Sequence, residues 1–234
     1  MHTITDSLGI ALRLVAGFDP RLVDIVALSL SVSLVATVLA ACIGLPLGAA
    51  VGVARFPGRG IAIAILNALM GLPPVVVGLF VYLMLSRAGP LGHFGILFTP
   101  NAMVIAQTIL IVPILAALSR QIVEDAWSEY REQLTSLGSR TLQSAMTLLW
   151  DTRYSLATVL LAGFGRAIAE VGAVMIVGGN IDGVTRVMTT TIALETSKGD
   201  LALALGLGVV LIALVLLLNF AAHATRAWSR TRFG

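Results

Sequence analysis

Two ionisable residues, Arg166 and Glu170, lie within an otherwise apolar stretch of the chain. Their spacing of four residues would place both side chains on one face of a helix. If that helix crosses a membrane, an ionised group near its centre costs about 2.5–3.5 kcal/mol, so each side chain needs a partner or water. In one interpretation the two residues neutralise each other or tie adjacent helices together. In the other, Arg166 faces a path through the membrane and attracts a tetrahedral dianion, while Glu170 holds it in place.

The composition indicates that lipid is the solvent for much of the chain. Of the 234 residues, 58% are hydrophobic and only 12% are charged, and the mean hydropathy is +0.98. Soluble domains carry about 25% charged residues, and a domain of this size has too little interior to hide so much apolar surface. The basic residues are spread between apolar runs, which argues against nucleic acid as a partner. The single cysteine, Cys42, provides neither a disulfide nor a zinc cluster.

Five apolar stretches are long enough, or nearly long enough, to cross a bilayer as helices. The sequence therefore predicts an all-α membrane protein with about five transmembrane helices. We expect an outer interfacial helix or tail over residues 1–21, a transmembrane domain over 22–222 and a cytoplasmic basic tail over 223–234. Within the domain, the five expected spans are residues 25–54, 61–85, 102–118, 156–177 and 201–222. A polar cytoplasmic loop, residues 119–155, separates the third span from the fourth.

The basic residues predict the orientation of these spans. With the N-terminus outside and the C-terminus inside, nine arginines fall in cytoplasmic segments and five basic residues fall outside. The opposite orientation would violate the positive-inside rule.

The polar loop is the longest one between spans and is a candidate docking segment. Good helix formers flank Gly138, which suits a break between two short helices. Apolar and charged faces alternate there, which is compatible with a partner protein and equally with a solvated cytoplasmic loop.

Four motifs resemble those of a known family. Glu132-Gln133-Leu134 followed by Gly138 resembles the E-A-A-x-x-x-G signature of ABC importer permeases, with Gln133 and Leu134 in place of the two alanines. Gly44–Gly48 is similar to the G-x-P-x-G of these permeases. The other two motifs, Gly71–Leu79 and the run from Gly165 to Ile181, resemble L-P-P-x-V-x-G-L and R-A-x-x-E-x-G-A…G-N-I of the molybdate, sulfate and tungstate branch. The resemblance is strongest to tungstate permeases.

The resemblance implies the transmembrane domain of a type I, binding-protein-dependent ABC importer, similar to methionine and molybdate permeases. Two copies of the chain would sit on two copies of a separate ATPase, in the cytoplasmic (inner) membrane of a bacterium or archaeon. An extracytoplasmic binding protein would deliver the substrate. The resemblance to tungstate permeases implies that this substrate is tungstate. The chain itself would bind no cofactor and would not be an enzyme, because ATP and Mg²⁺ belong to the ATPase. Consistently, the sequence has no phosphate-binding loop, and Lys198 is its only lysine.

The resemblance also suggests which residues carry the function. The coupling contact with the ATPase is expected within Glu132–Ser144, at Glu132, Gln133, Leu134, Gly138, Ser139 and Arg140. The translocation path is expected at Pro73, Pro74, Arg166, Glu170, Asn180 and Thr189. The two prolines form either a gate or a packing kink. The threonines at 189–191 either line the outer mouth or belong to an ordinary short helix with solvated hydroxyls.

Other functions remain as alternatives. Within the family these are a permease for molybdate or sulfate and, more remotely, for an amino acid. A secondary transporter driven by an ion gradient would need no ATPase, but the sequence has no convincing internal symmetry. An intramembrane enzyme is a further alternative, but the sequence contains neither the H-E-x-x-H motif of metalloproteases nor the G-x-S-x-G motif of serine hydrolases. In a homodimer, close helix contact between copies would be expected at small residues, namely Ala49, Ala50, Gly52, Gly206 and Gly208.

Overall fold

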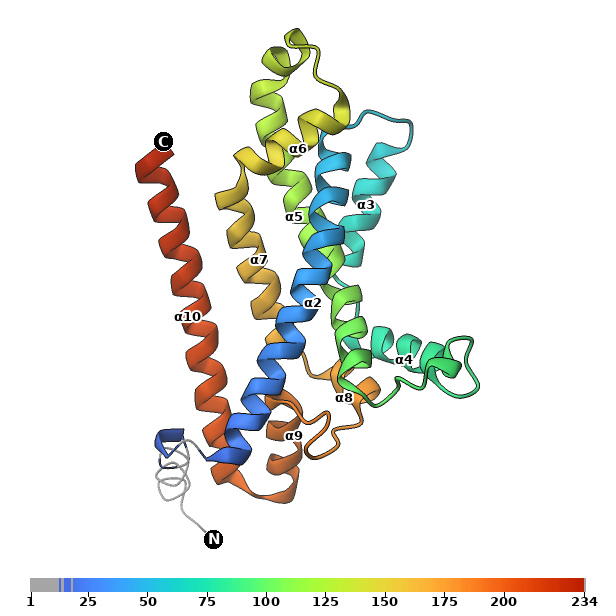
Figure 1. Ribbon diagram of the computed structural model, residues 1–234, viewed down its shortest axis with the longest axis vertical. Coiled ribbons are helices and arrows are strands. Elements are labelled where there is room, and N and C mark those ends of the chain that lie inside the picture. Colours follow the sequence, from blue (N-terminus) through green and yellow to red (C-terminus); the bar gives the residue numbers. More distant parts are fainter. Residues whose placement is uncertain (1–12, 14, 18, 234) are drawn as a thin grey trace. The chain divides into compact units, whose positions relative to one another are not determined.

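The computed structural model describes residue 13, residues 15–17 and residues 19–233, with side chains up to residue 224. The expected outer helix or tail of residues 1–21 lies mostly outside this range. No β-strand occurs in the described residues, and the predicted all-α class is confirmed. The elements, shown in Figure 1, are α2 (Pro20–Val53), α3 (Arg59–Leu69), α4 (Pro74–Leu85), the 3₁₀ helix η1 (Gly92–Phe94), α5 (Pro100–Ser136), α6 (Thr141–Asp151), α7 (Arg153–Ile168), α8 (Gly172–Gly178), α9 (Met188–Lys198) and α10 (Leu201–Phe233).

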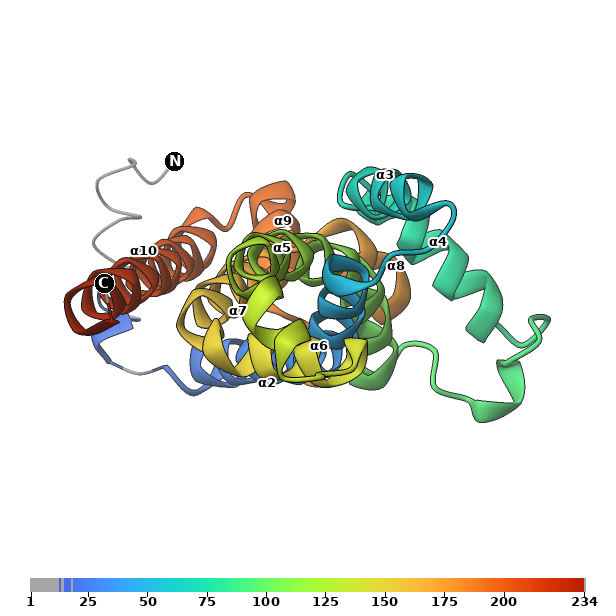
Figure 2. The ribbon, with the colours of Figure 1, turned by 90° about the horizontal axis from the view of Figure 1, so that it is seen from above.

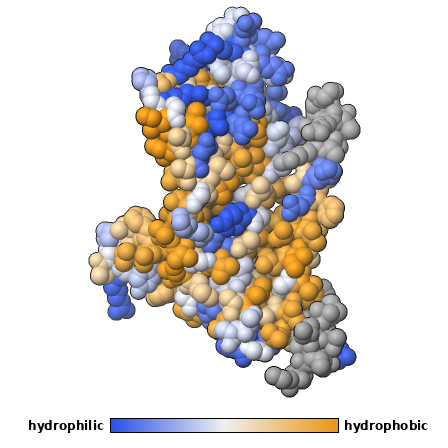
Figure 3. Space-filling model, turned by 180° about the vertical axis from the view of Figure 1, so that it is seen from behind, coloured by the Kyte–Doolittle hydropathy of each residue, from blue (hydrophilic) through white to orange (hydrophobic). Residues whose placement is uncertain are grey.

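Within the described residues, three helices are long and apolar enough to cross a membrane by themselves: α2, α5 and α10. Two interrupted pairs, α3 with α4 and α7 with α8, pass the same test only together, which gives up to five spans. Polar residues gather over the end that carries the turn between α5 and α6, and broad hydrophobic areas cover other parts of the visible face (Figure 3). The chain is therefore a multi-pass membrane protein.

The chain forms two compact units. Unit 1 comprises the described residues up to Val35, Pro73–Gln107 and Ala167–Leu217. Unit 2 comprises Ala36–Leu72, Thr108–Arg166 and the residues from Leu218 onward. The long helices α2, α5 and α10 contribute residues to both units.

The expected second span, residues 61–85, is two helices rather than one. α3 ends at Leu69 and α4 begins at Pro74. Leu72 precedes Pro73, and a residue before proline disfavours the helical conformation. Pro74 occupies the first position of α4, where a backbone N–H has no intrahelical partner and its loss costs nothing. The prolines therefore define the start of a helix and are not a kink within one.

The expected fourth span, residues 156–177, is also interrupted. α7 ends at Ile168 and α8 begins at Gly172. Glu170 lies in the break, outside any helix. The prediction that Arg166 and Glu170 share one face of a continuous helix is therefore wrong.

The expected third span, residues 102–118, is part of a much longer helix. α5 has 37 residues and continues to Ser136. It thus absorbs the first part of the loop expected at 119–155, because residues 119–136 contain neither glycine nor proline. The expected break at Gly138 is present: this residue has a φ of 71°, a left-handed conformation that favours glycine, and α6 begins three residues later.

A row of three glycines on α2 packs against α5 within unit 2. Gly44, Gly48 and Gly52 recur at every fourth position and so lie on one face of α2. A Cβ atom at Gly44 would lie 2.9 Å from the carbonyl oxygen of Val112, and one at Gly52 would lie 3.0 Å from that of Arg120. The absence of side chains lets the two helix backbones approach closely, as small residues do in membrane helix pairs.

Candidate translocation and coupling sites

The second and fourth spans are interrupted, and in unit 1 their α4 and α8 segments pack side by side (Figures 1 and 2). A Cβ atom at Gly78 of α4 would lie 2.8 Å from Cα of Ala173 on α8. One at Gly172 would lie 2.9 Å from Cγ2 of Val75. The sequence motifs that begin at Gly71 and Gly165 therefore meet at this contact.

Glu170 lies beside this contact and is 4% exposed. Its Oε1 accepts a hydrogen bond from the backbone N–H of Ala173 at 3.3 Å. This bond satisfies one of the donors that a helix start leaves without an intrahelical partner. The backbone carbonyl of Glu170 accepts a hydrogen bond from the hydroxyl of Thr189 at 2.7 Å. Glu170 thus links the start of α8 to the start of α9.

The threonines at the start of α9 are buried, so the prediction of solvated hydroxyls is wrong. Thr189, Thr190 and Thr191 are 6%, 0% and 0% exposed. The hydroxyl of Thr190 accepts the N–H of Val187 at 3.2 Å, and that of Thr191 donates to the carbonyl of Val187 at 2.7 Å. These hydroxyls hold the first turn of α9.

Asn180 lies in the segment between α8 and α9, with a φ of 51°. Its Nδ2 donates to the carbonyl of Thr190 at 3.4 Å. Its Oδ1 is buried and accepts no hydrogen bond from the described groups. The hydroxyl of Thr185 organises the same segment, because it donates to the carbonyl of Gly178 at 2.5 Å and accepts the N–H of Ile181 at 2.9 Å.

Sequence reasoning missed Gln107 on α5. This side chain is 4% exposed, and its Nε2 donates to the carbonyl of Ala167 at 3.0 Å. Its Oε1 is buried and has no hydrogen-bond partner in the described structure. The signal was a lone amide in the apolar stretch 102–118.

We call Gln107, Glu170, Asn180 and Thr189 the polar core of unit 1. All four side chains carry polar groups that lie inside the molecule, at or beside helix breaks. Irregular backbone and polar groups at membrane depth occur where they are covered by protein or line a cavity. Of the other predicted path residues, Pro73 and Pro74 start α4 in unit 1, whereas Arg166 belongs to unit 2, where it is exposed.

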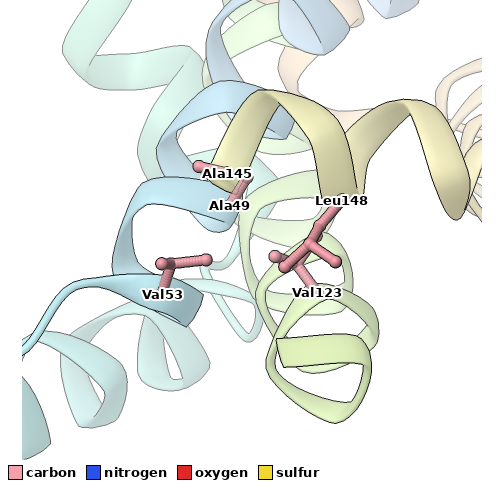
Figure 4. Packing of buried hydrophobic residues seen from close by; sticks show 5 residues of the cluster. All are labelled: Ala49, Val53, Val123, Ala145 and Leu148. Atoms are coloured by element: carbon pink, nitrogen blue, oxygen red, sulfur yellow. The ribbon is translucent and has the colours of Figure 1, made fainter. Parts of the chain in front are cut away.

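The predicted coupling segment in unit 2 has a buried face and an exposed face. On α6, Ala145 and Leu148 point inward and pack with Ala49 and Val53 of α2 and Val123 of α5 (Figure 4). Leu134 packs against the same cluster from the end of α5. Figures 1 and 2 show α6 lying across these helix ends.

The opposite face of α6 exposes a row of large apolar side chains. Leu142, Met146 and Trp150 recur at every fourth position and are 71%, 60% and 73% exposed. We call these three residues the α6 stripe. Leu137, in the turn before α6, is 82% exposed. Because this end of unit 2 is otherwise polar, the exposed apolar row is a candidate surface for contact with a partner protein.

Hydrogen bonds hold the turn that precedes α6. The hydroxyls of Ser139 and Ser144 are 2.9 Å apart, and the N–H of Arg140 donates to Oε1 of Gln143 at 3.0 Å. Of the predicted coupling residues, Glu132, Gln133, Gly138 and Arg140 are exposed, Ser139 is half-buried and Leu134 is held by the cluster. The structure thus brings these residues together at one end of unit 2.

Comparison with known proteins gives the family. No family model matches the chain. A probable anion ABC transporter permease of Haloferax volcanii is 44% identical over 203 residues, 85% of this chain and 88% of that protein. A tungstate uptake system permease of Peptoclostridium acidaminophilum is 41% identical over 224 residues, 96% of each chain. One of Campylobacter jejuni is 40% identical over 159 residues, 68% of this chain and 66% of that protein. Permeases of sulfate and molybdenum transport systems are more distant relatives.

The chain belongs to the ABC importer permeases. Its branch is that of the molybdate, sulfate and tungstate permeases, as the sequence motifs predicted.

In this permease, two small residues that the sequence suggested for a dimer contact are used within the chain. Ala49 is fully buried in the cluster under α6, and Gly52 packs against α5. Their assignment to contact between copies is corrected accordingly. Ala50 is exposed, and a Cβ atom at Gly208 would meet nothing within 4 Å.

Proposed function

We propose that this permease is the membrane-spanning subunit of an importer that moves tungstate inward. The observation that carries the proposal is the 41% identity to a tungstate uptake permease over 96% of both chains. The degenerate coupling motif and the motifs from Gly71 and Gly165 support the same branch. Molybdate and sulfate are the competing cargoes, because they are also tetrahedral dianions.

The translocation path in this proposal runs along the polar core of unit 1. Gln107 and Asn180 each have a buried oxygen without a hydrogen-bond donor, while their amide nitrogens are already bonded. Such groups would orient a hydrated or protonated cargo weakly, which suits transport, since a tight site would retain the ion. Arg166, an exposed cation of unit 2, would attract a dianion.

Transport would be driven by ATP hydrolysis on a separate ATPase, with ATP and Mg²⁺ bound there and no cofactor or catalytic activity in this chain. The α6 stripe supports this part of the proposal, because it is an apolar surface at a polar end of unit 2. Two copies of the permease would sit on two ATPase subunits in a bacterial or archaeal cytoplasmic membrane. An extracytoplasmic binding protein would deliver the cargo to the outer side, with the N-terminus outside and the C-terminus inside.

The test is uptake of tungstate by cells that carry the permease with its ATPase and binding protein. We expect saturable uptake that requires the ATPase. Added unlabelled tungstate should compete with this uptake better than molybdate or sulfate does. Absence of oxyanion uptake would refute the cargo assignment. Uptake that persists without the ATPase would instead favour a secondary transporter.

A further inference from the structure

A cavity of about 300 Å³ opens in unit 2 beside the loop that joins α2 to α3. Its walls come from the end of α2, the loop, the first residue of α3 and one face of α5. Three arginines line it, Arg55, Arg59 and Arg131, together with one carboxylate, Glu124. The lining therefore carries a net charge of +2, three positive charges less one negative charge.

One wall of the cavity is fixed by Arg59. Its Nε donates to the carbonyl of Val51 at 3.0 Å and its Nη2 to that of Gly52 at 3.3 Å, near the end of α2. The same Nη2 lies 2.8 Å from Oε1 of Glu124, and Arg120 pairs with the other oxygen of this carboxylate. Glu124 is thus neutralised by its own partners and does not compete for the remaining arginines.

Arg55 and Arg131 are those remaining arginines. Both are exposed, and neither guanidinium has a carboxylate partner among the described residues. The nearby acidic residues of α5 lie on another face, about 100° around the helix from the cavity face, by the 3.6-residue period. These acidic residues are Asp125, Glu129 and Glu132.

Exposed apolar side chains occur on the loop and on α3, the two elements that contribute Arg55 and Arg59 to the cavity. Phe56 of the loop is 42% exposed, and Ile61 and Ile65 of α3 are 69% and 53% exposed. α3 is part of a pair apolar enough to span a membrane. Trp127 lines the cavity itself, and tryptophan favours the boundary between lipid and water. The cavity therefore combines basic charge with an aromatic side chain, and it adjoins a helix with exposed apolar residues.

We propose that this cavity binds the phosphate group of an anionic phospholipid. Arg55 and Arg131 hold the phosphate through charge-assisted hydrogen bonds, and the acyl chains lie against Trp127 and the apolar surface of α3. A free phosphate ion shares the headgroup chemistry, but it would make no use of Trp127 or of the apolar surface of α3.

The test uses the purified full-length chain and native mass spectrometry with phosphatidylglycerol or phosphatidylcholine of the same acyl chains. The wild-type chain should retain phosphatidylglycerol in preference to phosphatidylcholine. Arg55→Gln and Arg131→Gln should each weaken this retention about fivefold, and the double variant roughly 25-fold, since one basic residue near a lipid surface contributes that much. Arg87→Gln replaces an exposed arginine of unit 1 that does not line the cavity, and it should leave retention unchanged.

Two further arms separate the sources of the phosphate group and exclude misfolding. Excess inorganic phosphate should not displace the bound lipid, and Arg55→Lys should retain more lipid than Arg55→Gln. Each variant should melt at the temperature of Arg87→Gln, because both replaced side chains are exposed. Equal retention of the two lipids, equal retention by the double variant, or full displacement by inorganic phosphate would each overturn the proposal.

Discussion

Replacement of Gly48 by alanine should force α2 and α5 apart within unit 2. The added Cβ would overlap the hydroxyl of Ser119 and the carbonyl oxygen of Ala116, and it would lie 2.8 Å from the backbone nitrogen of Arg120. The serine side chain can rotate away, but the two backbone atoms cannot. Since ordinary van der Waals contact begins near 3.4 Å, the Arg120 nitrogen alone requires α2 to shift by about 0.6 Å, and the closer carbonyl oxygen of Ala116 requires more.

The magnitude follows from the cost of overpacking. Forcing an extra methyl group into a close contact costs about 1–3 kcal/mol. For a chain of 234 residues this lowers the Tm by roughly 2–12 °C, at about 2–4 °C for each kcal/mol. Ala49 and Val53 also lie on this part of α2 and carry α6, so the same shift should weaken ATP-driven uptake.

The assay is thermal unfolding of the purified chain in one detergent at a fixed scan rate, because membrane proteins often unfold irreversibly. The decrease in Tm should be largest for Gly48→Ala, smaller for Gly44→Ala and smallest for Gly52→Ala, because the contacts of the added Cβ lengthen in that order. Gly208→Ala is the matched control, because its Cβ meets nothing within 4 Å. If Gly48→Ala and Gly208→Ala have the same Tm, the close packing of α2 on α5 is refuted.

Three other predictions concern the candidate sites. Gly138→Val should reduce ATP-dependent uptake strongly, whereas Gly138→Asn should retain most of it, because asparagine tolerates the left-handed φ of 71° and a β-branched residue does not; equal uptake by both variants would contradict this. Trp150→Ser should leave the Tm unchanged but reduce co-purification of the ATPase, whereas Leu148→Ser, at a side chain that is 2% exposed, should lower the Tm itself. Glu170→Ala should destabilise the chain by about 1 kcal/mol in a denaturant titration through loss of the bond to α8, and Glu170→Gln, which keeps an acceptor oxygen, should lose less; an equal loss would refute the capping role.

The sequence was sufficient to predict the class of protein and the locations of its apolar helices. Both follow from local composition, since each apolar stretch needs lipid or protein around it. The break at Gly138 was also predictable, because a glycine between good helix formers is a local signal. The prolines of α4 were recognised, but their role as a helix start was missed. A proline is compatible with a kink or a first turn, and only the neighbouring backbone distinguishes these.

The polar core of unit 1 was not predictable from local sequence. The break before α8 contains no proline, and it depends on the close approach of Gly172 to Val75, which lies almost one hundred positions away. The burial of α9 likewise depends on distant partners. The N–H of Met188 donates to the hydroxyl of Ser29 on α2 at 2.8 Å, across 159 positions of the chain. Such contacts leave no periodicity in the sequence.

The segment between α8 and α9 has a consequence for association at this surface. Thr185 bonds it to the end of α8, and Asn180 bonds it to the first turn of α9. Ordering a free backbone costs about 1–2 kcal/mol for each residue. Because this segment is already ordered in the folded chain, a binding partner would not have to order it again. A protein that docks on this segment therefore meets a preorganised surface. In the proposed importer, a delivery protein that docked here would therefore lose little affinity to ordering of this segment.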